Sequence, residues 1–351
     1  MQPDPTNKAK RAAAGWLAWV RQGFDNFAGR NGMREGSPWT GLDAVVQREF
    51  NDNLTSVRMR LLQALVFITG FAAAYAAIGE IKNLVSEDAF VFLKIFTVAK
   101  EPLPSFLAFL NFLIPIVAIT LGFDAINGEF NRRTMSRILA QPIYRDALLV
   151  GKFLGGLATL AVFLVALWLF MMGLGLLLIG LPPGLEEIVR GVLFLLAAIA
   201  YGGVWLAIAM LFSIYFRSTA TSALASLSLW LVFSVFWPMF APSVAGIISP
   251  ADPFDVNSQI ALINLREAIA RLSPNMLFTE AAAALLSPEL RSTSYVENIM
   301  LTRTPGALIG APLPLSQSLL LIWPQLTGLL AALIVLFTLA YAAFQRQEVR
   351  A

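Results

Sequence analysis

Long apolar stretches alternate with short polar ones along most of the chain. A helix needs about 20 mainly apolar residues to cross the roughly 30 Å hydrocarbon core of a bilayer. Six stretches of this sequence are long enough. The pattern therefore predicts six transmembrane helices, at approximately 61–79, 105–126, 150–180, 189–213, 219–241 and 318–344.

The composition agrees with a membrane protein. Of the 351 residues, 58% are hydrophobic and 13% are charged, whereas globular proteins have about 25% charged residues. The predicted fold class is an all-α integral membrane protein, with a six-span domain over residues 61–345. The absence of Cys and His excludes disulfides, thiol catalysis and His/Cys metal sites, and we predict no metal site. A net charge of only +3 gives no support for nucleic-acid binding.

The segment before the first span divides into two parts. Residues 1–41 combine Gly, Pro and charges and are predicted to be a cytoplasmic N-terminal extension, whose role the sequence does not indicate. Residues 42–60 place apolar side chains at helical spacing and predict an amphipathic helix in the membrane interface, in contact with lipids. Arg48, Arg58 and Arg60 are expected on its polar side or among the lipid head groups.

The distribution of positive charge predicts the orientation of the spans. With both termini in the cytoplasm, 17 Lys and Arg residues lie inside and 8 outside, which is the bias of plasma or inner-membrane proteins. The tail, 346–351, is then cytoplasmic. Residues 242–317 are then extracytoplasmic, with helical stretches at 257–272 and from 273 to 286, and we expect them to cap the outer ends of the spans.

The polar loop 127–149, between the second and third spans, has the most distinctive pattern. Arg132, Arg133 and Arg137 lie in an expected short helix near 131–140, which ends at Gln141-Pro142 because proline disfavours helical geometry in the residue before it. A second helix then continues through Lys152 into the third span. A short basic helix joined rigidly to two spans suits a cytoplasmic loop that binds a soluble protein.

The residues of this loop resemble the ABC-2 family of ATP-binding-cassette permeases. The similar positions are Glu129, Thr134, Leu139, Gln141-Pro142-Ile143, Arg145 and Gly151-Lys152, and the chain departs from the family at Arg133, where the family has Gly. The resemblance covers about 42–345. It implies the transmembrane permease subunit of an ATP-driven exporter, with two copies of a separate ABC ATPase and a second permease copy as partners, in a homodimer. The residues that it assigns to ATPase coupling are Glu129, Arg132, Arg133, Thr134, Arg137, Gln141, Pro142, Arg145 and Lys152.

The chain itself has no nucleotide-binding motif. Gly151-Lys152 could belong to a phosphate-binding loop only with a glycine at Asp146 and a hydroxyl at Phe153. We therefore expect that this chain is not an enzyme and that ATP and Mg²⁺ bind the partner ATPase. Asp252, Asp255, Arg266 and Glu267 resemble a solvated loop face more than the catalytic set of a membrane enzyme.

Several residues within the spans have two interpretations. Phe109, Phe112, Trp230, Phe233 and Phe236 either contact lipid or form the wall of a conduit for apolar or amphipathic cargo. Asp124 is the only ionisable residue expected near the bilayer, and pairing with a loop arginine is favoured over a proton relay. Gly151-x-x-x-Gly155 and Gly202-Gly203 allow close helix approach, within the chain more than between copies.

Two functions remain open at this point. The first is export of an apolar or amphipathic substrate. The alternative is an ABC-type mechanical or assembly factor that acts on an extracytoplasmic partner protein, as in nitrous oxide reductase maturation or gliding, with 242–317 as its docking surface.

Overall fold

The computed structural model describes residues 39–84, 90–134, 144–180, 182–252, 254–293 and 312–346. The chain divides into two units, Met1–Thr40 and Gly41–Ala351, and every element below belongs to the second. Within the described ranges the ordered elements are helices, and no strand occurs.

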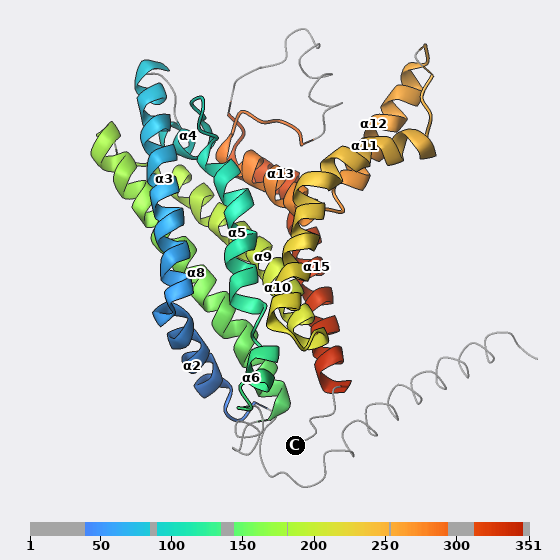
Figure 1. Cartoon of the computed structure of the whole chain (residues 1–351). Coiled ribbons are helices and arrows are strands. Elements are labelled where there is room, and N and C mark those ends of the chain that lie inside the picture. Colours follow the sequence, from blue (N-terminus) through green and yellow to red (C-terminus); the bar gives the residue numbers. More distant parts are fainter. Residues whose placement is uncertain are drawn as a thin grey trace, which may run out of the picture. The chain divides into compact units, whose positions relative to one another are not determined.

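Six long helical segments form the bundle (Figure 1), and each is long and apolar enough to cross a membrane. The prediction of an all-α membrane protein with six spans is confirmed. The third span is the longest, at 35 residues. The segments are α3 (Val57–Leu84), α5 (Phe106–Gly122), α8 (Arg145–Ile179), α9 (Leu185–Tyr215), α10 (Thr219–Leu231) with η1 (Val232–Phe236) and α11 (Trp237–Ile248), and α15 (Leu315–Arg346).

Helix α9 is the central element of this bundle, since it packs against α5, α8, α10, α13 and α15. The glycine pair Gly202-Gly203 of α9 allows α8 and α15 to approach α9 closely. A Cβ on Gly202 would clash with Leu160 of α8, and one on Gly203 would lie 2.6 Å from Leu333 of α15. The two glycines therefore serve packing within the chain.

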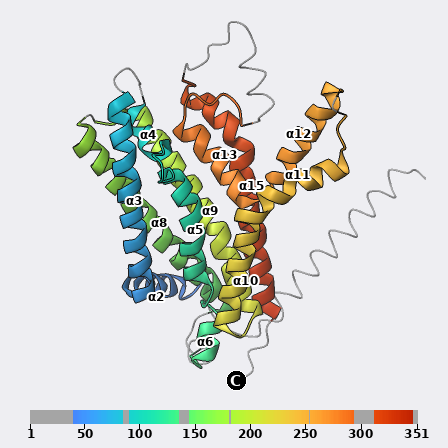
Figure 2. The ribbon, with the colours of Figure 1, turned by 45° about the horizontal axis from the view of Figure 1, so that its top comes forward.

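The shorter helices gather at the two ends of the bundle (Figures 1 and 2). Helices α2 (Leu42–Thr55) and α6 (Asn127–Asn131) lie at one end, called here the α6 end. Helices α4 (Val91–Thr97), α12 (Val256–Ala270) and α13 (Pro274–Leu286) lie at the opposite, α13 end. Helix α13 packs into the bundle against α9 and α15, whereas α11 and α12 form a hairpin that projects sideways from it.

One predicted helix has a different boundary in the structure, and another falls largely outside the described residues. The helix expected over 42–60 ends at Thr55, because Ser56 is extended and its Oγ accepts a hydrogen bond from the Met59 amide, which caps the start of α3. Arg58 and Arg60 thus belong to α3. A short helix lies at Asn127–Asn131, whereas most of the helix expected near 131–140 falls on residues 135–143, outside the described ranges.

The expectation that Asp124 is the only ionisable residue near the bilayer is wrong. Arg190 lies in the span formed by α9 and is fully buried. Its guanidinium pairs with Glu186 at 2.8 Å and donates hydrogen bonds to the carbonyl of Leu313, at 2.6 Å, and to the hydroxyl of Ser318, at 3.0 Å. These bonds satisfy the buried charge and tie α9 to the start of α15.

Candidate functional site

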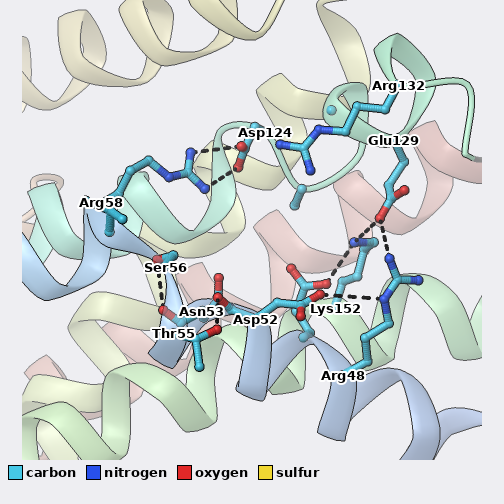
Figure 3. Close-up of a pocket in the computed structure, with 14 residues that line it drawn as sticks. Arg48, Asp52, Asn53, Thr55, Ser56, Arg58, Asp124, Glu129, Arg132 and Lys152 are labelled. Atoms are coloured by element: carbon cyan, nitrogen blue, oxygen red, sulfur yellow. Dashed lines mark hydrogen bonds and ion pairs between the residues drawn. The ribbon is translucent and has the colours of Figure 1, made fainter.

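A polar pocket of about 620 Å³ opens at the α6 end. Its lining residues come from α2, α3, α6 and α8, together with the turn after α5 (Figure 3). The lining includes four basic and four acidic side chains, so that the formal charges balance. They are Arg48, Arg58, Arg132, Lys152, Glu49, Asp52, Asp124 and Glu129.

Lys152 of α8 is the buried centre of this cluster, with a side chain only 5% exposed. Its Nζ lies 2.8 Å from Glu49 of α2 and 3.4 Å from Glu129 of α6. Arg48 approaches the same Glu129 carboxylate at 3.7 Å. One ammonium group therefore connects three helices, α2, α6 and α8 (Figure 3).

The close approach of α2 to α8 depends on two glycines of α8. A Cβ on Gly151 would lie 2.7 Å from Val45, and one on Gly155 would lie 2.8 Å from the Cβ of Glu49 and 3.1 Å from the Val46 carbonyl. The Gly-x-x-x-Gly pattern thus provides the surface on which α2 rests. This contact places the Glu49 carboxylate next to Lys152.

The chain after α6 folds back onto Glu129. Thr134 donates its amide to the Glu129 carbonyl at 3.0 Å, and its hydroxyl contacts the Glu129 carboxylate. This turn requires a left-handed backbone at Arg133, whose φ is 56°, a region that favours glycine. The resemblance to a family with glycine at this position therefore has a conformational basis.

Hydrogen bonds fix the base of α6 to the end of α9. The Ser213 hydroxyl accepts from the amides of Ile126, at 2.9 Å, and Asn127, at 3.2 Å. The Asn127 side chain donates to the Phe216 carbonyl at 3.2 Å, and that of Asn131 donates to the Arg217 carbonyl at the same distance. Helix α6 is thus held by α9 on one side and by the Lys152 cluster on the other.

A second ion pair joins α3 to the turn after α5. Arg58 forms two hydrogen bonds with Asp124, at 2.8 and 3.4 Å, and its guanidinium lies over the Phe123 ring. Asp124 therefore pairs with an arginine at the start of α3 and not with the expected loop arginine. Arg48 likewise contacts Asp52 and Glu129.

The structure brings together part of the predicted coupling set. Glu129, Arg132 and Lys152 line the pocket, and Thr134 contacts Glu129. Arg145 lies elsewhere: it donates to the carbonyl of Phe344 at 3.0 Å and stacks on that ring. Arg137, Gln141 and Pro142 lie outside the described residues. Sequence reasoning missed Glu49 and Asp52, which follow Arg48 in the predicted amphipathic helix.

The predicted conduit residues come together only in part. Phe112 of α5 and Trp230 of α10 meet edge to face, with ring centroids 4.7 Å apart. Phe109 and Phe233 are half-buried, and Phe236 contacts Phe240 of its own helical segment. The aromatic contact between α5 and α10 thus rests on one pair.

In the described ranges no group of three or more carboxylates that could hold a metal ion occurs.

These features define a multi-pass helical membrane protein in which a short helix between two spans meets an ionic cluster at one end of the bundle. A family model described as "ABC-2 family transporter protein" matches residues 44–349, and the chain belongs to this family.

Two curated relatives are similar to this chain over part of their length. The "Probable ABC transporter permease protein NosY" of Stutzerimonas stutzeri is 30% identical over 139 residues, which are 39% of this chain and 50% of the relative. The protein of the same name from Pseudomonas aeruginosa is 32% identical over 152 residues, which are 41% and 52% of the two chains. The chain thus spans about half the length of the curated relatives that it matches.

Proposed function

We propose that this chain is the permease subunit of an ATP-driven ABC-2-type exporter. A separate ABC ATPase, present in two copies with bound ATP and Mg²⁺, binds the α6 end from the cytoplasm, and two permease copies form the membrane part. Membership of the ABC-2 family supports the class, and the exposed end of α6 supports the docking position.

The surface of α6 suits a contact with another protein. Phe130 is exposed, as are Asn131, Arg132 and Arg133, which form the outward tip of the segment. An aromatic ring beside arginines is a common composition at protein interfaces. The base of α6, in contrast, is bonded to α9 and to the Lys152 cluster. A partner that binds the tip can therefore displace the base.

The contact of Lys152 with both Glu49 and Glu129 is the observation that carries the proposal. Lys152 belongs to a span, Glu49 to α2 and Glu129 to α6. Movement of α6 changes the position of one carboxylate beside a buried ammonium group, and this couples α6 to α8 electrostatically. A force applied at α6 thereby reaches the membrane.

A second connection joins α8 to the last span. Arg145 donates to the Phe344 carbonyl, and Asp146 accepts hydrogen bonds from Tyr341 and Gln345. The start of α8 and the end of α15 therefore move together. A movement of α6 that displaces the start of α8 would therefore also displace the end of α15. The edge-to-face pair Phe112–Trp230 lies in the bundle that such a movement would reshape. Its apolar character favours an apolar or amphipathic substrate.

Co-purification tests this proposal. The tagged chain is co-expressed with the ABC ATPase chains of its own genome and purified in mild detergent. We expect an ATPase in a one-to-one ratio. The charge reversal Arg132→Glu should reduce the retained ATPase about tenfold or more, since unfavourable charge contacts cost several kcal/mol at an interface.

The matched control is Glu289→Lys, a charge reversal at an exposed position of the α13 end, which should leave ATPase retention unchanged. Absence of any ATPase in several mild detergents, or equal retention by both variants, would overturn the docking position. Transport of a fluorescent amphipathic probe into vesicles then distinguishes export from a purely mechanical role.

A further inference from the structure

The fifth span is interrupted by one π-helical turn, η1, between α10 and α11. The amide of Trp237 donates to the carbonyl of Val232, five residues back instead of four, so that the turn is wider than that of an α-helix and holds one additional residue. The axis of α11 turns away from that of α10 at this point (Figures 1 and 2). We propose that η1 is a two-state element that α13 holds in its π form, and that its conversion to an α-helix rotates α10 relative to α11.

Pro238 explains why neither form of this turn is complete by itself. In an α-helix, a proline ring clashes with the carbonyl four residues back, which here belongs to Ser234. A wider turn before the proline relieves this clash. In the π form, however, the carbonyl of Phe233 would need an amide hydrogen from residue 238, and proline supplies none. Each form thus has a carbonyl without its usual helical donor, so that the balance between them depends on donors from outside the helix.

Helix α13 supplies such donors to the π form. The Ser273 hydroxyl donates to the Phe233 carbonyl at 3.1 Å, and the Asn275 side chain donates to the Ser234 hydroxyl at 2.6 Å. Ser273 and Asn275 are 2% and 6% exposed, so that loss of either bond would leave a buried polar group unsatisfied. These two hydrogen bonds, called here the α13 latch, favour the π form, because a change of register would turn Phe233 and Ser234 away from α13.

The α13 latch is also connected to the last span. Glu280 of α13 is buried and accepts a hydrogen bond from Gln325 of α15 at 2.7 Å. Arg271, which follows α12, donates to the same carboxylate at 2.9 Å. One buried carboxylate therefore joins the end of α12, α13 and α15. A displacement of α15 would reach α13 through this contact and would pull on the latch.

Release of the latch would change the contact between α10 and α5. A shift of register by one residue is a rotation of about 100°. Trp230 of α10 is 7% exposed and meets Phe112 of α5 edge to face, with ring centroids 4.7 Å apart. The rotation would carry Trp230 off the Phe112 ring and open the α5–α10 contact. The surface of the bundle would thereby change without the unfolding of any helix.

Paired spin labels in the cysteine-free chain can measure this rotation. Labels at Ile68→Cys of α3 and Leu224→Cys of α10 report the position of α10 by double electron–electron resonance, and the pair Ile68→Cys with Ile247→Cys reports that of α11. All three positions are exposed. The protein, monodisperse on gel filtration, is reconstituted in phospholipid nanodiscs with an excess of unlabelled copies, so that only distances within one chain are recorded. The permease is measured alone, and the result is therefore independent of whether an ATPase binds the α6 end.

Two variants should populate the α form. Pro238→Ala removes the clash that disfavours the α-helix, so that a second distance should become the main one for at least one label pair. Ser273→Ala removes one bond of the latch and should raise the population of that second distance about fivefold, as expected for the loss of an ordinary hydrogen bond. The matched control is Thr279→Ala, which removes an α13 hydroxyl that donates to the Asn275 carbonyl of its own helix and should leave both distances unchanged.

A deletion separates a change of register from general damage. Val235 is an exposed residue of η1, and its deletion together with Pro238→Ala gives a continuous α-helix in which α10 and α11 keep their original rotation. We expect this double change to restore the original distances. Unchanged distances in both Pro238→Ala and Ser273→Ala would overturn the proposal, because η1 would then be a fixed bend. A second distance that the deletion does not remove, or an equal effect of Thr279→Ala, would overturn it as well.

Discussion

At the residue scale, two residues of the α6 end are unusual, one in its backbone conformation and the other in its side-chain contacts. Arg133 adopts a left-handed backbone, and Lys152 shares one buried ammonium group between two carboxylates from different helices. The first is a conformational cost in a loop, and the second is an electrostatic contact in the bundle. Each can be altered without touching the other.

Replacement of Arg133 by glycine should stabilise the turn after α6. A left-handed conformation costs a non-glycine residue about 1 kcal/mol, so Arg133→Gly should slow hydrogen exchange of the Thr134 amide, which bonds to the Glu129 carbonyl, by about fivefold. Arg132→Gly is the matched control, because Arg132 has an ordinary right-handed backbone and glycine there should speed exchange. Equal effects of the two variants would show that backbone strain at Arg133 is not relieved.

Replacement of Lys152 by methionine should destabilise the protein. The change leaves Glu49 and Glu129, which are 17% and 14% exposed, without their shared cation and should lower the free energy of unfolding by about 2 kcal/mol. Thermal unfolding in detergent measures this loss. The control is Lys100→Met. Lys100 pairs with Glu80, which is more exposed, so that loss of this ion pair should lower the free energy of unfolding by less than about 1 kcal/mol. The double variant Lys152→Met with Glu129→Gln should recover part of the lost stability.

At the element scale, the contact of α2 with α8 determines the geometry of the pocket. Gly155→Val would force a side chain into the Val46 carbonyl and the Glu49 side chain, and such overpacking costs about 1–3 kcal/mol. We expect α2 to move away from α8, so that a spin label at Gln47→Cys on its exposed face becomes more mobile. Gly173→Val in the same helix is the control, because a Cβ there meets nothing within 4 Å. Unchanged mobility in the Gly155 variant would contradict the packing role of this glycine.

The elements themselves could be predicted from the sequence to a large extent, because long apolar runs depend only on local composition. The end of α2 was missed because the apolar spacing continues past Ser56, while the cap at Ser56 is a local hydrogen bond that this spacing does not reveal. The partners of Lys152 could not be predicted. Glu49 is 103 positions away in the chain, and only the packing of α2 on the glycines of α8 brings it close.

At the scale of the whole molecule, the two ends of the bundle differ in kind. The α6 end has a solvent-accessible cluster of balanced charges. At the α13 end, Arg190 is buried and bonded to the start of α15. A transporter that receives force at one end and contacts cargo at the other would need such an asymmetry. Because the two ends differ in this way, the proposed function depends on which end faces the cytoplasm.

The orientation can be measured with single cysteines in the cysteine-free chain. Asn131→Cys lies at the exposed tip of α6, and Asn257→Cys lies in the exposed first turn of α12. Because a topology with both termini in the cytoplasm puts 17 of the 25 Lys and Arg residues inside, the positive-inside bias predicts that the loop containing α6 is cytoplasmic. A membrane-impermeant maleimide should then label Asn257→Cys in spheroplasts of the expression host and Asn131→Cys only in inside-out vesicles. The opposite labelling would place α6 away from ATP and would exclude a cytoplasmic ATPase as its partner.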